Sequence, residues 1–227
     1  MPSLTQLLRS HRQLLVLDAA SSRVQVGLLR AGSDPIWHAA EADAGTEIFR
    51  GVTIVLERAG LEIGNIAATV FGEGPGSLLG IRTAAMALRT WSGLSARPTF
   101  AFQSLAVAGT HEWRRQPPRD FSVLADARRG CWHCQTVGAD GRLEPLRRLP
   151  EADLPTGEWV MPEQFRTWTP PPRPMGRCSY DLAKIFAAIA DCDRFHAVDA
   201  AEPFQPEPTG YRKWTAGVHS LDSVERK

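Results

Sequence analysis

The sequence has almost no excess of charge of either sign. It carries 26 Lys and Arg residues against 25 Asp and Glu residues, a formal net charge of +1. Proteins that bind nucleic acid directly usually have a basic surplus that neutralises phosphate groups. We therefore predict no direct binding of nucleic acid. The pairs Arg114-Arg115, Arg128-Arg129 and Arg147-Arg148 are more typical of solvated turns and strand edges than of a basic stripe, which is the alternative.

Long apolar runs and a disulfide framework are also absent. No stretch approaches the roughly 20 apolar residues that span a bilayer. The first 13 residues lack the apolar segment of a signal peptide. Four cysteines in 227 residues are too few for a disulfide scaffold, while 43% hydrophobic residues exclude a disordered chain. We expect a soluble, reduced protein of the cytoplasm with no membrane contact.

Residues that usually carry catalysis or bind metal are sparse. The sequence has six histidines, and His111-Glu112-Trp113-Arg114-Arg115 has an arginine where a zinc-protease motif needs its second histidine. Cys131 and Cys134 form a lone C-x-x-C pair on an expected strand, where positions three apart face opposite sides. We expect no metal site and no catalytic residue in this chain.

Apolar runs separated by polar turns predict an α/β protein with a mixed sheet. Three runs in succession indicate an antiparallel meander, and Thr46 and Gly60 mark the N-cap and the end of the helix that follows. Two further strand–helix pairs complete a βββαβαβα order. The expected strands are 14–18, 24–29, 35–40, 66–71 and 98–102, and the expected helices are 46–60, 78–92 and 104–111.

Pro117 and Pro118 indicate a boundary, because proline cannot continue a helix. The strand-rich stretch that follows repeats the opening of the chain weakly, as expected for two lobes around a cleft. Its expected strands are 121–126, 131–137 and 143–149, followed by a helix at 181–190 and irregular structure after Glu202. We divide the chain into an N-terminal extension (1–13), an N-terminal lobe (14–116) and a smaller, degenerate C-terminal lobe (117–227) with a proline-rich segment at 169–174.

The most distinctive stretch is glycine-rich and runs from Gly72 to Arg82 at the start of a helix. Exposed backbone N–H groups and the helix dipole suit such a loop to phosphate, but the lysine of a P-loop is missing. The alternative is a tight turn with Ser77 as N-cap. Asp18, at the end of the first strand, either orients a metal-bound phosphate or caps its own turn.

The helix that follows Ser77 is apolar around nearly its whole circumference, from Leu78 to Trp91. A helix on the surface of a globular protein is normally apolar on one face only. This helix is therefore either an interior helix or a surface helix with one face covered by another chain.

Three segments together resemble the TsaB (YeaZ) family of tRNA threonylcarbamoyladenosine (t6A) biosynthesis. The opening run 15–20 with 26–29 resembles the family's Leu-Asp-Thr/Ala start, and 72–82 resembles its Gly-x-Gly-Pro-Gly-Ser-Phe-Thr-Gly-x-Arg centre. The turn 126–130, Asp-Ala-Arg-Arg-Gly, resembles a third family segment. The resemblance covers about residues 14–137. Leu78 and Leu79 stand where the family has Phe and Thr.

The resemblance implies an actin/Hsp70-like (ASKHA) two-lobe fold that has lost its own active site. A TsaD-like partner would transfer the threonylcarbamoyl group to adenosine 37 of tRNA, and a TsaE-like protein would join the complex. The resemblance places the partner interface on the first two long helices, which would pair with a partner or with a second copy. Within them we expect these residues to be exposed contacts: Phe49, Thr53, Leu79, Thr83, Met86 and Thr90.

The resemblance also implies a vestigial phosphate loop with a weak residual affinity for ATP or ADP, formed by Asp18, Gly74, Gly76 and Ser77. Three alternatives to a non-catalytic scaffold stay open at this point. One is an active ATP-dependent kinase of the same fold, which would use Asp18 and the glycine-rich loop. Another is a paralogue with a different partner. The third is the glycoprotease (peptidase M22) activity once assigned to the family, which the missing histidine pair disfavours.

Overall fold

The first lobe is built on one mixed sheet. Its strands are β1 (Gln13–Asp18), β2 (Arg23–Arg30), β3 (Ile36–Glu41), β4 (Ala68–Gly74), β5 (Thr99–Gln103) and β11 (His196–Val198). In the computed structural model, which describes residues 1–204, they follow the order β11-β5-β4-β1-β2-β3. β1 pairs antiparallel with β2 and parallel with β4, so the expected meander leads into a parallel layer.

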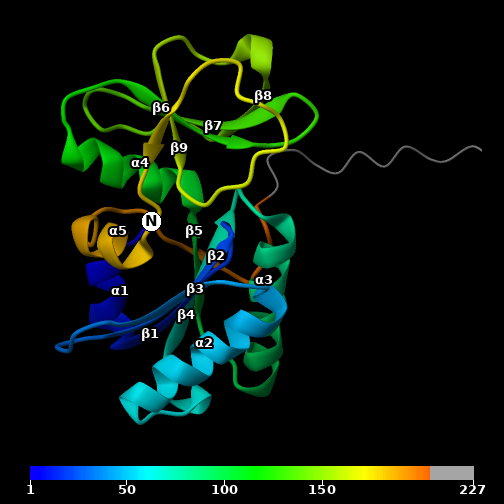
Figure 1. Ribbon diagram of the computed structural model, residues 1–227. Coiled ribbons are helices and arrows are strands. Elements are labelled where there is room, and N and C mark those ends of the chain that lie inside the picture. Colours follow the sequence, from blue (N-terminus) through cyan, green and yellow to red (C-terminus); the bar gives the residue numbers. More distant parts are fainter. Residues whose placement is uncertain (205–227) are drawn as a thin grey trace, which may run out of the picture.

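Helices cover both faces of this sheet (Figure 1). On one face lie α2 (Ala44–Ala59) and α3 (Leu78–Leu94), and on the other lie α1 (Leu4–His11) and α5 (Leu182–Ala188). Alternate residues of β1 serve the two faces, because side chains along a strand point to opposite sides. Leu15 and Leu17 pack with α2 and α3, whereas Leu14 and Val16 pack with α1 and α5. β1 is therefore buried on both sides.

The second lobe repeats the strand pattern of the first. Its strands are β6 (Phe121–Asp126), β7 (Cys131–Val137), β8 (Arg147–Pro150), β9 (Glu158–Pro162) and β10 (Gly176–Cys178). The order β10-β9-β6-β7-β8 matches β5-β4-β1-β2-β3 strand for strand. In both sheets three strands form an antiparallel meander, and the fourth pairs parallel with the first. The two sheets thus have the same strand order and the same strand pairing, as the weak repeat in the sequence indicates.

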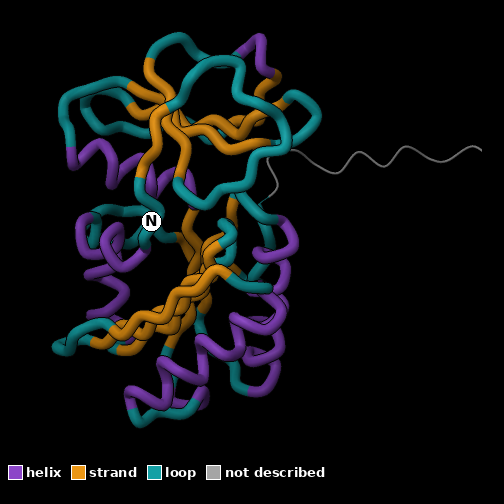
Figure 2. Tube along the Cα trace, in the orientation of Figure 1, coloured by secondary structure: helices purple, strands orange, loops and turns teal. Residues whose placement is uncertain are grey.

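In the described residues, the second lobe has no counterparts of the two long helices, α2 and α3, that connect strands of the first sheet. Where α2 joins β3 to β4, only the short 3-10 helix η2 (Glu151–Asp153) joins β8 to β9. Where α3 joins β4 to β5, a loop that contains the proline-rich segment 169–174 joins β9 to β10. Figure 2 shows how much of this lobe is loop. Among residues 1–204, the long helix that packs on its sheet is α4 (Ser104–Arg115), which follows β5.

After β10 the chain returns to the first lobe. Phe186 of α5 packs edge-on against Trp37 of β3 and Phe102 of β5, and β11 pairs antiparallel with β5. Residues 182–198 therefore extend the first lobe, whereas the sequence pattern assigns everything after residue 117 to the second. The N-terminal residues are also part of this lobe, because Leu4 and Leu7 of α1 are buried in its core.

Element ends differ from the expected ones for identifiable reasons. Asp43, not Thr46, is the N-cap of α2: its Oδ1 accepts a hydrogen bond from the Thr46 backbone N–H, so the helix begins at Ala44. The strand expected at 66–71 begins at Ala68, since the short 3-10 helix η1 (Ile63–Asn65) precedes it. Most of the irregular segment expected after Glu202 lies outside the described residues.

Candidate functional site

The α2–α3 face, defined by Phe49, Leu79 and Met86, exposes large apolar side chains to solvent. These side chains are 48%, 73% and 59% exposed. The Phe49 ring packs edge-on against Trp91 of α3, with ring centroids 5.9 Å apart, which ties the two helices together. The opposite sides of the helices belong to the core, with these residues buried: Ile48, Val52, Val55, Ile81, Ala85 and Leu88. Of the two possibilities for α3, the structure shows a surface helix.

Threonines lie beside these apolar residues at regular intervals. Thr53, Thr83 and Thr90 each stand four residues after one of them, and each hydroxyl donates a hydrogen bond to the backbone carbonyl of that residue. Thr53 and Thr90 are exposed and Thr83 is half-buried. Because each hydroxyl is used within its own helix, it leaves mainly its methyl group to the α2–α3 face. The face is therefore more apolar than its residue types indicate.

Asp18 is fully buried and holds two parts of the first lobe together. Its Oδ1 accepts a hydrogen bond from the Ala20 backbone N–H (3.2 Å), and its Oδ2 accepts one from the Tyr180 hydroxyl (2.9 Å). Burial raises the pKa of Asp18 to about 6, although the two hydrogen bonds favour the charged form. Asp18 has no exposed surface, and its hydrogen bond to the Ala20 N–H caps the turn after β1.

The glycine-rich loop is closed against the turn that follows Asp18. A Cβ at Gly76 would lie 2.2 Å from the Ala20 carbonyl oxygen, and a Cβ at Gly72 would lie 2.1 Å from Asp18 Oδ2. The Ser77 N–H donates to the same Ala20 oxygen, and Ser77 Oγ caps α3. Gly74 has a positive φ of 107°, which suits glycine. The loop thus forms a tight turn that packs on the turn after β1 and leads into α3.

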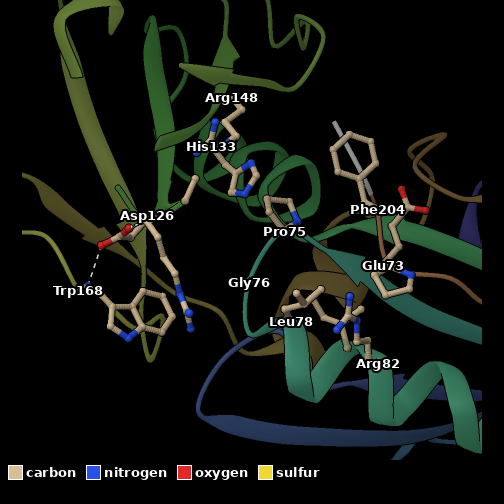
Figure 3. A pocket seen from close by; sticks show the side chains of 14 residues that line it. Glu73, Pro75, Gly76, Leu78, Arg82, Asp126, His133, Arg148, Trp168 and Phe204 are labelled. Carbon is tan, nitrogen blue, oxygen red and sulfur yellow. Dashed lines mark hydrogen bonds between the residues drawn. The ribbon is translucent and has the colours of Figure 1, made fainter. Parts of the chain in front are cut away.

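A cleft of about 420 Å³ lies between this loop and the second lobe (Figure 3). In Figure 3, His133 and Arg148 lie across the cavity from Leu78 and Arg82, and Trp168 and Phe204 lie at opposite sides of it. Gly76 lines the cleft, but Asp18 does not. The expected phosphate-loop residues are therefore neighbours in space without forming one open site.

Asp126 organises the wall of the cleft in the second lobe. Its Oδ1 accepts a hydrogen bond from the Arg128 backbone N–H, and its Oδ2 accepts one each from the Trp168 and Thr169 backbone N–H groups. This carboxylate thereby fixes the turn after β6 to the start of the proline-rich segment. The Arg128 guanidinium stacks on the Trp168 ring, 4.2 Å from its centroid.

Three arginines that the sequence pattern did not single out as site residues line the cleft: Arg82, Arg128 and Arg148. Two of them belong to the arginine pairs that are typical of solvated turns, and only the fold shows that they face one cavity. The pair at Arg114-Arg115 is different, because Arg114 makes a bidentate ion pair with Asp191. The arginine pairs therefore do not form one stripe.

Residues that could hold a metal are not gathered in the described part of the chain. No group of three or more His, Cys, Asp or Glu side chains there could bind an ion. Cys131 is half-buried and Cys134 is buried, and burial raises the pKa of the Cys134 thiol. His111 lies buried in α4, and its pKa is lowered by burial. Within residues 1–204, no helix is long and apolar enough to cross a membrane.

Comparison with known proteins identifies the fold. No family model and no curated protein matches the sequence. Among solved structures, YeaZ from Pseudomonas aeruginosa superposes with a TM-score of 0.61 at 22% identity, over 78% of this chain and 90% of that one. The chain has the fold of YeaZ.

A second solved structure agrees with this result. It is described as an uncharacterized protein with similarity to peptidase YEAZ from Pseudomonas aeruginosa. It superposes with a TM-score of 0.64 at 20% identity, over 86% of this chain and 99% of that one. The expected two-lobe α/β fold with a mixed sheet in each lobe is confirmed.

Proposed function

We propose that the chain is a non-catalytic, TsaB-like partner of a TsaD-type threonylcarbamoyltransferase in the t6A modification of tRNA. The α2–α3 face is the observation that carries this proposal. Support also comes from the YeaZ fold and from the sequence segments that resemble the TsaB family. In this proposal the chain contributes a binding surface, and the partner contributes the chemistry.

The α2–α3 face has the properties of a protein interface. Binding would remove apolar surface of Phe49, Leu79 and Met86 from contact with water. This burial favours binding by about 25 cal/mol per Å². Contiguous apolar patches on a soluble protein mark interaction sites more often than chance exposure. Because the exposed apolar residues lie on two adjacent helices, the face suits a pair of helices from the partner, packed as a four-helix bundle. The threonine methyl groups would let the helices approach closely.

The burial of Asp18 supports a partner without its own catalysis. An active kinase would need this carboxylate, or another one near the glycine-rich loop, to be accessible to a metal-bound phosphate. Here Asp18 is held by Tyr180 and Ala20 inside the lobe. The nucleotide and metal of the reaction would thus belong to the TsaD-like protein, with a TsaE-like protein joining the assembly. Without that partner, the same face would hold a second copy of the chain.

Capture of the partner from the native cell extract tests this proposal. The tagged full-length chain is expected to recover a TsaD-like protein, and Met86→Arg is expected to abolish recovery, because a charge would be buried in an apolar interface. Ala152→Arg, on the exposed 3-10 helix of the second lobe, is the matched control and should bind normally. Met86→Arg should also turn any homodimer of the isolated chain into a monomer in size-exclusion chromatography.

Three outcomes would contradict the proposal. Recovery of an unrelated protein through the same face, with no TsaD-like protein, would identify a paralogue with a different partner. Hydrolysis of ATP by the isolated chain, lost in Asp18→Asn, would instead identify an active kinase. Unchanged capture by folded Met86→Arg protein would show that the α2–α3 face is not the interface.

A further inference from the structure

The exposed side of α3 has a basic border. An α-helix turns by about 100° per residue, so Arg82 and Arg89 lie about 40–60° around the helix from Met86, both in the same direction. Trp91, whose ring contacts Phe49 of α2, lies in the opposite direction from Met86. Arg82 and Arg89, here called the arginine edge, therefore border the α2–α3 face on the side of α3 that points away from α2.

The positive charge of the arginine edge is hardly compensated within the chain. Arg82 and Arg89 are exposed, and they are the only charged residues of α3. Within residues 1–204, Arg82 makes no salt bridge. Arg89 lies 3.8 Å from Glu202, but the two side chains are 53% and 67% exposed, and such surface pairs contribute little. Both guanidinium groups are therefore available to carboxylates of a partner.

A second copy of the chain is a poor source of such carboxylates. Its α3 would present the same two arginines. In its α2, Glu47 is buried against His38, and exposed Glu57 is accompanied by exposed Arg50 and Arg58. Together the two helices expose four arginines and one glutamate. Because like charges across an interface repel each other, the charges beside the α2–α3 face favour a different, acidic partner.

We propose that the α2–α3 face binds a helix pair whose apolar stripe is bordered by carboxylates, and that Arg82 and Arg89 select this partner over a second copy of the chain. The two arginines are seven residues apart, which is about 10.5 Å along α3. Their acidic counterparts are therefore expected about two turns apart on one partner helix that runs alongside α3. Charges beside an apolar seam determine partner choice in paired helices. The inference rests on the proposed function, because it requires the α2–α3 face to be the interface.

Binding kinetics at low and high salt test the arginine edge. The probe is the TsaD-like protein of the same cells, purified separately and mixed with the full-length chain. Arg82→Glu and Arg89→Glu should each lower the association rate about tenfold and change the dissociation rate little, because a charge at the rim acts mainly on encounter. Association of the unmodified chain should slow as salt rises, and less so in these variants. Arg89→Lys keeps the charge and should associate normally.

Arg58→Glu is the matched control. It makes the same change of charge at an exposed position of α2, but it lies about 180° around that helix from Phe49 and so away from the α2–α3 face. It should associate with the partner about as fast as the unmodified chain. In addition, changing one interface carboxylate of the partner to arginine should restore fast association with Arg89→Glu.

Self-association of the isolated chain tests the same charges with the opposite sign. We expect a monomer, or a weak dimer that becomes more stable as salt rises, because salt screens the repulsion between the arginines. Sedimentation equilibrium at the two salt concentrations measures this. A dimer that is as stable as the complex with the partner, or one that dissociates as salt rises, would overturn the selection.

The outcomes separate this inference from the proposed function. If Met86→Arg abolishes binding but Arg82→Glu and Arg89→Glu associate as fast as Arg58→Glu, the face is the interface and the arginine edge does not select the partner. Faster association at high salt, or a partner on which no carboxylate change restores Arg89→Glu, would overturn the inference in the same way. Normal binding by folded Met86→Arg would instead contradict the proposed function, and the inference with it.

Discussion

The pKa values of buried Asp18 and half-buried His133 are displaced in opposite directions, that of Asp18 upward and that of His133 downward. Asp18 titrates at about 6 in the folded chain, because burial disfavours its charge, whereas an unfolded Asp titrates at about 3.9. His133 titrates at about 4, because burial and Arg148 disfavour its charge, whereas an unfolded His titrates at about 6.5. The two groups act on stability in opposite directions over nearly the same pH window.

The sign for each group follows from proton linkage. Between pH 4 and 6 the folded state binds more protons at Asp18 than the unfolded state does, so this group lowers the free energy of unfolding as pH rises. At His133 the unfolded state binds more protons than the folded state from pH 4 to 6.5. This group therefore raises the free energy of unfolding as pH rises. Each effect totals about 3 kcal/mol at 1.36 kcal/mol per pKa unit. In the unmodified chain the two largely cancel.

Single substitutions should separate these effects. Asp18→Asn is expected to make stability rise more steeply between pH 4 and 6.5, and His133→Gln is expected to make it rise less or fall. Urea unfolding at pH 4, 5 and 6.5, followed by circular dichroism, measures both slopes relative to the unmodified chain. Slopes that stay unchanged in both variants would show that neither group has a displaced pKa.

At the scale of one element, α3 contains two glycines in opposite situations. A Cβ at Gly80 would lie 2.2 Å from the Ala19 carbonyl oxygen, because the first turn of α3 packs directly on the turn after β1. A Cβ at Gly93 would meet nothing within 4 Å. Helix propensity alone favours alanine over glycine by about 1 kcal/mol at either site. Packing therefore decides the difference.

Alanine substitutions at these two positions should change stability in opposite directions. Gly80→Ala is expected to destabilise the chain by about 1–3 kcal/mol, since backbone must move to admit the methyl group. Gly93→Ala is expected to stabilise it by up to about 1 kcal/mol. Chemical denaturation of both variants gives the comparison. Stabilisation by Gly80→Ala would mean that α3 does not approach the Ala19 turn as closely as the structure has it.

Local signals explain which elements the sequence predicts well. Ser77 and Gly60 act where their chemistry indicates, and the apolar spacing of α2 predicts its buried face. α3 is apolar on nearly every side, so the exposure of Phe49, Leu79 and Met86 was predicted from the family resemblance and not from spacing. The prediction of Thr46 as the N-cap of α2 was wrong. Asp43, three residues earlier, is an equally good cap by residue type, and it is the one that caps the helix. The cleft was missed because Arg82, Arg128 and Arg148 meet only through tertiary packing.

Across the whole molecule, the helices after the fifth strand of each sheet pack across the lobe boundary. α4 leaves the first sheet and packs on β6 and β7, while α5 leaves the second and packs on β3 and β5. The sequence does not predict this exchange, because α5 and β11 are short and carry no signal for their partners. α1 is held next to the end of α5, because the Thr5 N–H donates a hydrogen bond to the Ala190 carbonyl.

This exchange predicts one cooperative unfolding transition for both lobes. A continuous set of buried side chains runs from Leu7 of α1 through Phe102 and Phe186 to Leu124 and Trp132 of the second sheet. Neither lobe can unfold without exposing apolar surface of the other. Leu124→Ala in the second sheet should cost about 2–5 kcal/mol and lower the melting of both lobes together. Calorimetry tests this: equal calorimetric and van 't Hoff enthalpies are expected, and a separate early transition in the variant would show two independent lobes.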